Sequence, residues 1–235
     1  MTRPERVKVL ILEDSIIQRN RSKNAELLAK VYDHVSHKFQ KGFTLLTLGW
    51  LDGYSFIPVG FNMLSSANKD NRYQKIFTDI DHRTSGYKSR SESLIQKTDA
   101  AILLIQRALA VGIKADYVLM DTWFTTGTYA EKILLSGLDA IGMVKQLKQR
   151  YFFPGKAYTL SELRKFMRQE STANIFGSLV VTTKEGISVK IVVVRNRDKK
   201  SECLYLLSTD CSLSDAEIVR IYGNRWVNRG FFQGI

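Results

Sequence analysis

Short apolar runs alternate with polar segments along the first half of the chain, and this pattern predicts strands joined by turns. Runs that end at a polar stop predict buried strands over Val7–Leu12, Thr44–Trp50 and Ser55–Leu64, with an Asp-Gly hairpin turn between the last two. The polar segment Asn68–Ser91 has few apolar anchors and predicts a loop. This part of the chain therefore predicts strands with polar connections.

The middle of the chain has the pattern of an α/β layer. Apolar residues at helical spacing predict a helix over Ala100–Val111, capped by Asp99. A strand over Tyr117–Met120, a helix over Thr128–Leu135 and a strand over Ala140–Val144 follow in order. Such alternation of strand, helix and strand is typical of α/β proteins.

The last third of the chain is richer in β-forming residues. Strands are predicted over Ser178–Thr183, Ser188–Arg195 and Cys203–Ser208. Capping boxes that begin at Thr159 and Ser214 predict two helices. We therefore predict an α/β fold in three parts: a first core part at 1–149, a β-rich insertion at 150–211, and the start of a final helix at 212–235.

Composition narrows the class of protein. The chain has 235 residues, of which 44% are apolar, and this excludes a disordered or fibrous protein. No apolar run approaches the roughly 20 residues that a membrane helix needs, and the first residues are polar. The cysteines Cys203 and Cys211 show no metal or disulfide spacing. We therefore expect a cytoplasmic protein with no secretory leader and no membrane partner.

The charge balance bears on the partner. Lys and Arg number 35 and Asp and Glu number 23, which gives a formal net charge of +12. This excess favours polyanionic partners such as nucleic acid, although a solubilising surface would have the same composition. Three cations, Arg19, Arg21 and Lys23, follow the first predicted strand and are predicted to contact a phosphate backbone.

Two aspartates occupy the same position relative to a predicted strand. Asp14 follows the run Val7–Leu12, and Asp121 follows Tyr117–Met120. Residues just past the carboxyl ends of strands line the ligand crevice of an α/β sheet, and two carboxylates that converge there need a cation. Their hard oxygen atoms suit Mg²⁺ or Mn²⁺. Each aspartate alone is equally consistent with a turn or a helix cap.

Around these residues the sequence resembles insertion-sequence transposases of the DDE class. Within that class it is similar to the family with a Tyr-x2-Arg-x3-Glu-x6-Lys signature around the third acid. The resemblance implies a ribonuclease-H-like catalytic fold, in which a mixed sheet is flanked by helices and a β-rich insertion precedes the last helix. The matching stretches are Leu10–Ser15, Arg21–Ala29, Tyr32–His34, Gly42–Gly53, Tyr117–Phe124 and Ile221–Trp226.

The resemblance implies specific chemistry and partners. Asp14 and Asp121 would be the first two metal-binding carboxylates, and an intact relative would hold two Mg²⁺ or Mn²⁺ ions. The activity would be metal-dependent cleavage of transposon-end DNA and strand transfer into target DNA, without a small-molecule cofactor. The resemblance further implies a homodimer on DNA, in a bacterial cytoplasm and associated with the nucleoid. Tyr222 and Arg225 match the first two signature positions and would contact DNA.

The sequence departs from the signature at the third acid. The catalytic Glu is expected at position 229, which is Arg229, and the Lys expected at position 236 lies beyond Ile235. Arg229 is a fixed cation and would repel a metal ion bound there. At about 4 Å and an effective dielectric constant of about 20, this repulsion costs on the order of 4 kcal/mol per unit charge. We therefore expect a C-terminal truncation, from a frameshift or a premature stop, and a missing DNA-end-binding segment before Asp14.

Two alternatives to an active transposase stay open on the sequence. One is a catalytically dead remnant that only binds DNA non-specifically, as Arg229 suggests. The other is a related nuclease of the same fold that cuts without joining strands.

Overall fold

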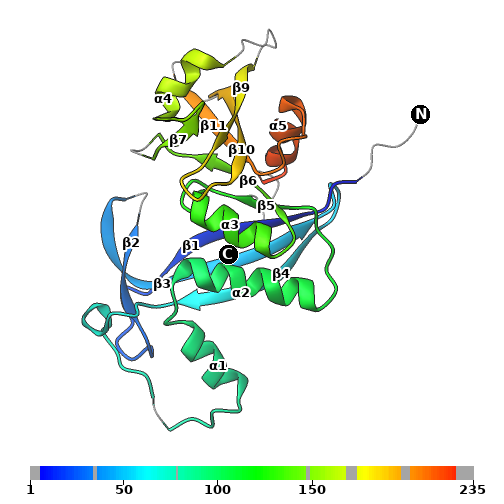
Figure 1. Cartoon of the computed structure of the whole chain (residues 1–235). Coiled ribbons are helices and arrows are strands. Elements are labelled where there is room, and N and C mark those ends of the chain that lie inside the picture. Colours follow the sequence, from blue (N-terminus) through cyan, green and yellow to red (C-terminus); the bar gives the residue numbers. More distant parts are fainter. Residues whose placement is uncertain are drawn as a thin grey trace. The chain divides into compact units, whose positions relative to one another are not determined.

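The computed structural model describes residues 6–33, 36–77, 79–146, 149–167, 174–196 and 202–225. The chain divides into two compact units, whose elements are labelled in Figure 1. Unit 1 comprises Met1–Ile11, Gly49–Ile57 and Lys114–Ile235, and unit 2 comprises Leu12–Leu48 and Pro58–Ile113. Three strands, β1, β3 and β4, pass from one unit into the other.

Unit 1 is built on a mixed sheet. The first residues of β1 pair in parallel with β5, and β5 pairs in parallel with β6. From β6 onward each neighbour is antiparallel, in the order β11, β10, β9, β7 and β8. The strand bounds are β1 Val9–Gln18, β5 Tyr117–Met120, β6 Asp139–Val144, β7 Tyr151–Phe153, β8 Lys156–Tyr158, β9 Ile175–Thr182, β10 Ser188–Arg195 and β11 Cys203–Ser208.

The helices of unit 1 begin at side-chain caps. Helix α3 (Gly127–Leu135) begins after Thr126, whose hydroxyl accepts the N–H of Tyr129. Helices α4 (Leu160–Leu163) and α5 (Asp215–Gly223) each begin at the predicted capping box, and a 3₁₀ turn, η2 (Arg164–Phe166), follows α4. Helix α3 packs on β6, and α5 packs on β6, β9 and β11. The core below α5 is aliphatic, with Val192, Leu206 and Ile218 buried.

Unit 2 joins a curved group of strands to two helices. Strand β3 (Lys38–Leu51) lies between β1 and β2 (Ala29–Asp33) and also pairs with β4 (Phe56–Leu64). The 3₁₀ turn η1 (Lys69–Asn71) and the helix α1 (Ser85–Glu92) precede α2 (Lys97–Ala110). Helix α2 buries one face, which consists of Ala100, Ala101, Leu104, Ile105 and Ala108. The chain is therefore a mixed α/β protein in which helices flank a large mixed sheet.

Strand β1 corrects the prediction that the first strand stops at Leu12. The strand continues through Asp14 to Gln18. The Glu13 carbonyl accepts the hydroxyl of Thr47 at 3.3 Å. Past the strand's end, the Arg19 N–H donates to the Lys41 carbonyl at 2.7 Å. Polar residues did not end the strand, because pairing with β3 satisfies its backbone.

Two further predictions in unit 2 were wrong. The segment predicted as a loop contains α1, which Thr84 caps by accepting the N–H of Tyr87. Helix α2 begins at Lys97, and its N-cap is Gln96, with no side-chain cap bond. Asp99 lies in the first turn of α2, where a negative charge interacts favourably with the helix dipole.

The β-rich character predicted for 150–211 is observed, since β7 to β11 fall within it. The domain boundaries at 149/150 and 211/212 stay predictions. None of the described helices has the length and apolar composition that crossing a membrane would require.

Candidate functional site

Asp121 is held at the end of β5 by a tight turn. Its Oδ1 accepts the N–H of Trp123 at 2.9 Å and the N–H of Phe124 at 3.3 Å. Its carbonyl accepts the hydroxyl of Thr125 at 2.6 Å. These bonds fix the carboxylate through Oδ1, and Oδ2 has no hydrogen-bond partner among the described residues. Asp121 therefore presents one oriented, half-buried oxygen at a strand end.

The turn after Asp121 depends on a close approach by β6. Phe124 and Thr125 are buried below it. Gly142 of β6 faces Thr125, and a Cβ atom at Gly142 would overlap the Thr125 hydroxyl and crowd the Met120 side chain. The missing side chain at Gly142 therefore lets Thr125 reach the Asp121 carbonyl.

We expect Gly142→Ala to lower the free energy of unfolding by about 1–3 kcal/mol, the usual cost of overpacking a buried site. The added methyl group must displace Thr125, so the Asp121 turn should also lose order. Urea unfolding measures the first effect, and amide hydrogen exchange at Trp123 and Phe124 measures the second.

Gly223→Ala is the matched control, because nothing lies within 4 Å of a Cβ atom built there. Gly223 ends α5, so this change should leave stability equal or slightly higher. Equal unfolding curves for Gly142→Ala and the unchanged chain would contradict the packing argument.

Asp14 lies in unit 2 and is paired with a cation. Its Oδ2 accepts a hydrogen bond from the Lys97 Nζ at 2.8 Å, and the two side chains are 19% and 16% exposed. Strand β1 carries the acid, and the first residue of α2 carries the base. The Asp14 carboxylate is therefore neutralised locally by an ammonium group that lies 83 positions away in the sequence.

In the sheet of unit 1, the strands that lead to these two acids pair with each other. Strands β1 and β5 are parallel, with Ile11 opposite Leu119. Asp14 follows Ile11 by three positions, and Asp121 follows Leu119 by two. Asp14 belongs to unit 2 and Asp121 to unit 1, so a metal ion shared by them stays a prediction. Within the described residues, no group of three or more His, Cys, Asp or Glu side chains could hold a metal ion.

The predicted phosphate-binding cations lie on the surface of unit 2. Arg19, Arg21 and Lys23 are exposed and follow the end of β1. The segment is tied down by its backbone, since the Lys23 carbonyl accepts the Gln74 amide at 2.5 Å. These side chains are accessible to a polyanion, and their contact with DNA stays a prediction.

Tyr222 and Arg225, the other predicted DNA contacts, lie inside unit 1. Tyr222 is 4% exposed and Arg225 is 1% exposed. The Arg225 Nη1 donates to the Tyr222 hydroxyl at 3.4 Å. A DNA contact by these side chains would require their exposure, and it stays a prediction. Arg229, at the expected third-acid position, lies outside the described residues.

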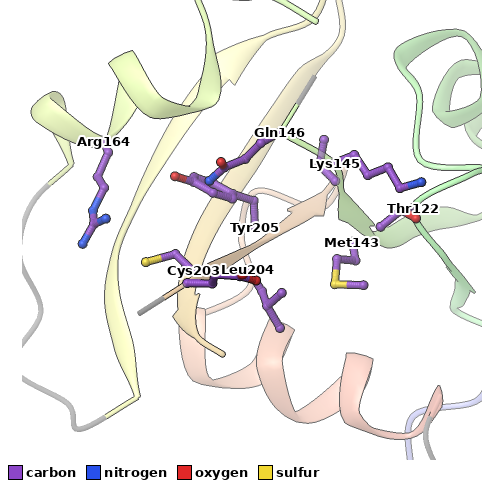
Figure 2. Close-up of a pocket in the computed structure, with 10 residues that line it drawn as sticks. Thr122, Met143, Lys145, Gln146, Arg164, Cys203, Leu204 and Tyr205 are labelled. Carbon is purple, nitrogen blue, oxygen red and sulfur yellow. The ribbon is translucent and has the colours of Figure 1, made fainter. Parts of the chain in front are cut away.

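The structure contains a pocket of about 400 Å³ in unit 1. One of the residues that line it is Thr122, which directly follows Asp121 in the sequence. Figure 2 shows Lys145 and Thr122 on one side of Tyr205, with Arg164 on the other. Burial raises the pKa of the Tyr205 hydroxyl. The sequence did not reveal this pocket, because its walls come from segments far apart in the chain. The full lining is Thr122, Met143, Val144, Lys145, Gln146, Arg164, Glu202, Cys203, Leu204 and Tyr205.

Comparison with known proteins relates the chain to a protein family and to a solved transposase structure. No curated protein matches the chain. Among solved structures, the chain is similar to a piggyBac transposase seen by cryo-EM in a synaptic complex with hairpin DNA, at 16% identity and a TM-score of 0.44. That match covers 92% of this chain and 37% of the piggyBac chain, so this chain spans well under half of that protein's length. Residues 1–157, more than half of the chain, match the family model described as DDE superfamily endonuclease. The chain therefore belongs to the DDE superfamily endonuclease family.

Proposed function

We propose that this chain is the catalytic domain of a DDE transposase that cleaves DNA with divalent metal ions. The observation that carries the proposal is the pairing of β1 with β5. The two strands run in parallel, and the chain reaches Asp14 and Asp121 a few positions beyond the paired residues Ile11 and Leu119. Both acids lie within residues 1–157, the stretch that matches the DDE superfamily endonuclease model, and this is consistent with the proposal.

The donor atoms suit Mg²⁺ or Mn²⁺. Carboxylate oxygens are the ligands that these hard ions prefer. The Asp14 carboxylate already forms an ion pair with the Lys97 ammonium group, and Asp121 keeps one oxygen oriented outside its turn. When bound, paired divalent ions lower the pKa of an attacking water and stabilise the leaving oxygen of a phosphodiester. The role proposed for Asp14 and Asp121 is to hold the ions.

The remaining features of the proposal concern DNA handling. Arg19, Arg21 and Lys23 would bind the phosphate backbone, where released counterions favour association. We extend the proposal to strand transfer at the ends of an insertion sequence, by a homodimer with a ribonuclease-H-like core. Tyr222 and Arg225 would act near the third acid, as the signature resemblance implies.

A second candidate function follows from Arg229. Where the resemblance expects the third acid, the sequence has a cation that opposes a bound metal ion. The chain would then be a catalytically inactive protein that binds DNA non-specifically.

A plasmid-nicking experiment separates the two functions. Supercoiled plasmid is incubated with the chain and with Arg229→Glu, in Mg²⁺, in Mn²⁺ and in EDTA. Metal-dependent nicking by the unchanged chain supports the proposed activity, and nicking by Arg229→Glu alone supports the inactive form. DNA binding without nicking by either protein would overturn the proposed cleavage. A strand-transfer assay with a labelled 3′ end then distinguishes a transposase from a nuclease that only cuts.

Lys97→Met is expected to raise the affinity for Mn²⁺ about fivefold. Lys97 and a divalent ion compete for the Asp14 carboxylate, and a partly exposed ion pair is worth about 1 kcal/mol. Titration calorimetry with Mn²⁺ measures this change. Lys69 is an exposed lysine of the same unit that forms no ion pair with Asp14 among the described residues, so Lys69→Met should leave the Mn²⁺ affinity unchanged. Equal Mn²⁺ affinities for the two variants would show that Lys97 does not compete with the metal ion for the Asp14 carboxylate.

A further inference from the structure

One face of the β2–β3 hairpin gathers exposed aromatic rings. The strands are antiparallel, with Tyr32 opposite Phe39 and Lys30 opposite Lys41. Residues two apart on a strand share a face, so these four side chains project together. Tyr73 joins them from the segment bridged to the start of β2. We call Lys30, Tyr32, Phe39, Lys41 and Tyr73 the hairpin face.

The rings of the hairpin face are accessible and organised. Phe39 is 59% exposed, Tyr73 51% and Tyr32 39%. Tyr32 and Phe39 meet edge to face, with ring centroids 5.1 Å apart. Large aromatic side chains gathered on a surface mark an interaction site more often than scattered ones do.

The two lysines lie over these rings. The Lys30 Nζ is 4.4 Å from the centre of the Phe39 ring, and the Lys41 Nζ is 4.7 Å from the centre of the Tyr73 ring. Neither lysine forms an ion pair with a described acidic residue. The lysines are therefore held in place by the rings while their charge stays uncompensated.

The hairpin face continues into the cationic segment that follows β1. The Arg19 N–H donates to the Lys41 carbonyl at 2.7 Å, and the Lys41 Nζ donates to the Ser22 carbonyl at 3.4 Å. Arg21 and Lys23 flank Ser22 in the chain. A row of cations thus runs from the Arg19–Lys23 segment onto a surface of aromatic rings.

We propose that the hairpin face binds an unpaired DNA strand, with phosphates on the lysines and bases stacked on the rings. Proteins that bind single strands combine a cationic track with aromatic platforms in this way. A duplex would use only the cations, because its bases are already stacked on one another. The uncompensated charge favours a nucleic acid over a protein partner. The proposal rests on the proposed function only in taking DNA as the ligand.

The test measures binding of a fluorescein-labelled 20-nucleotide oligo(dT) by the whole chain, by anisotropy and in EDTA so that no cleavage occurs. The unchanged chain should bind the single strand more tightly than a duplex of equal length. Phe39→Ala should weaken single-strand binding about tenfold, since stacking on one aromatic ring commonly contributes that much. Lys30→Gln with Lys41→Gln should lower the slope of log affinity against log salt by about 1.4.

Two further variants keep the test decisive. Phe39→Trp should retain affinity, and its added indole fluorescence should be quenched by oligo(dT), which reports stacking directly. Tyr54→Ala is the matched control, because Tyr54 is an exposed ring in unit 1 with the Arg6 guanidinium 4.5 Å from its centre. Arg6 also forms an ion pair with Asp52 at 3.6 Å, and neither residue belongs to the hairpin face, so Tyr54→Ala should change single-strand affinity less than twofold.

Three results would overturn the proposal. They are equal affinity for duplex and single strand, an unchanged single-strand affinity in Phe39→Ala, and a loss of single-strand affinity in Tyr54→Ala as large as that in Phe39→Ala. The same titrations with Asp121→Asn, together with plasmid nicking in Mg²⁺ by this variant and by the hairpin variants, separate the two hypotheses. If Asp121→Asn loses nicking but still binds oligo(dT), the result bears on the proposed metal site alone. If the hairpin variants bind oligo(dT) normally and still nick plasmid, only the proposal for the hairpin face is rejected.

Discussion

Asp121→Asn is expected to reduce metal-dependent nicking by at least about a hundredfold. Removing a residue that merely orients a metal ligand typically costs 10- to 100-fold, and the loss of a ligand itself should exceed that. The amide oxygen of Asn can still accept the N–H groups of Trp123 and Phe124, so the turn should survive. Quantified plasmid nicking in Mg²⁺ and in Mn²⁺ measures the effect.

Asp14→Asn is expected to reduce metal-dependent nicking for the same reason. It removes the carboxylate charge that is paired with the Lys97 ammonium group. Asp79→Asn is the control in unit 2, because Asp79 is exposed and outside the proposed site. Thermal unfolding of each variant shows that the fold persists. Nicking at the unchanged rate by folded Asp14→Asn or Asp121→Asn would reject that residue as a metal ligand.

Lys190→Met is expected to lower the free energy of unfolding by about 3 kcal/mol. The Lys190 Nζ lies 2.7 Å from Asp215 Oδ1, and the Asp215 side chain is only 4% exposed. Lys190 also donates to the Leu213 carbonyl at 2.8 Å, which ties β10 to the start of α5. Removal of the lysine leaves a carboxylate buried without its cation, the costly case for buried ion pairs. Urea unfolding followed by circular dichroism measures the loss.

Two comparisons test that explanation. Lys190→Met with Asp215→Asn removes both charges, and should recover part of the stability lost in the single variant. Arg107→Met breaks the more exposed pair with Glu92 and should cost less than about 1 kcal/mol. If Lys190→Met lowers the free energy of unfolding by no more than Arg107→Met does, burial does not determine the strength of the ion pair between Lys190 and Asp215.

Some elements could be predicted from the sequence to the residue. Strands Tyr117–Met120, Ser188–Arg195 and Cys203–Ser208 have the predicted bounds, because stretches rich in apolar residues end at polar residues. The capping boxes at Thr159 and Ser214 also form as predicted. In each case the determining information lies within a few neighbouring positions.

Other elements depend on partners far away in the sequence. Strand β2 reads Ala-Lys-Val-Tyr-Asp, which has no apolar run, and its pairing with β3 defines it. Helix α1 has no apolar face, and its Arg90 forms an ion pair at 2.8 Å with Glu26, which lies 64 positions away in the sequence. No periodicity within these segments could have revealed them.

The candidate site divides in the same way. The position of Asp121 directly after a strand could be predicted, because strand ends are a local signal. The Lys97 partner of Asp14 could not, since it comes from a helix 83 positions away. The burial of Tyr222 and Arg225 depends on how α5 packs, which a signature spacing does not contain.

The pairing of Val9–Ile11 with Tyr117–Leu119 has a consequence for synthesis. A ribosome releases the first of these segments 108 positions before the second, as the register Val9 to Tyr117 shows. During that interval the nascent apolar segment lacks the neighbour that completes its ladder, and such segments are prone to aggregate. Closure of this part of the sheet is thus a late, long-range step in folding, because its strand pairing cannot form until both segments have been synthesised.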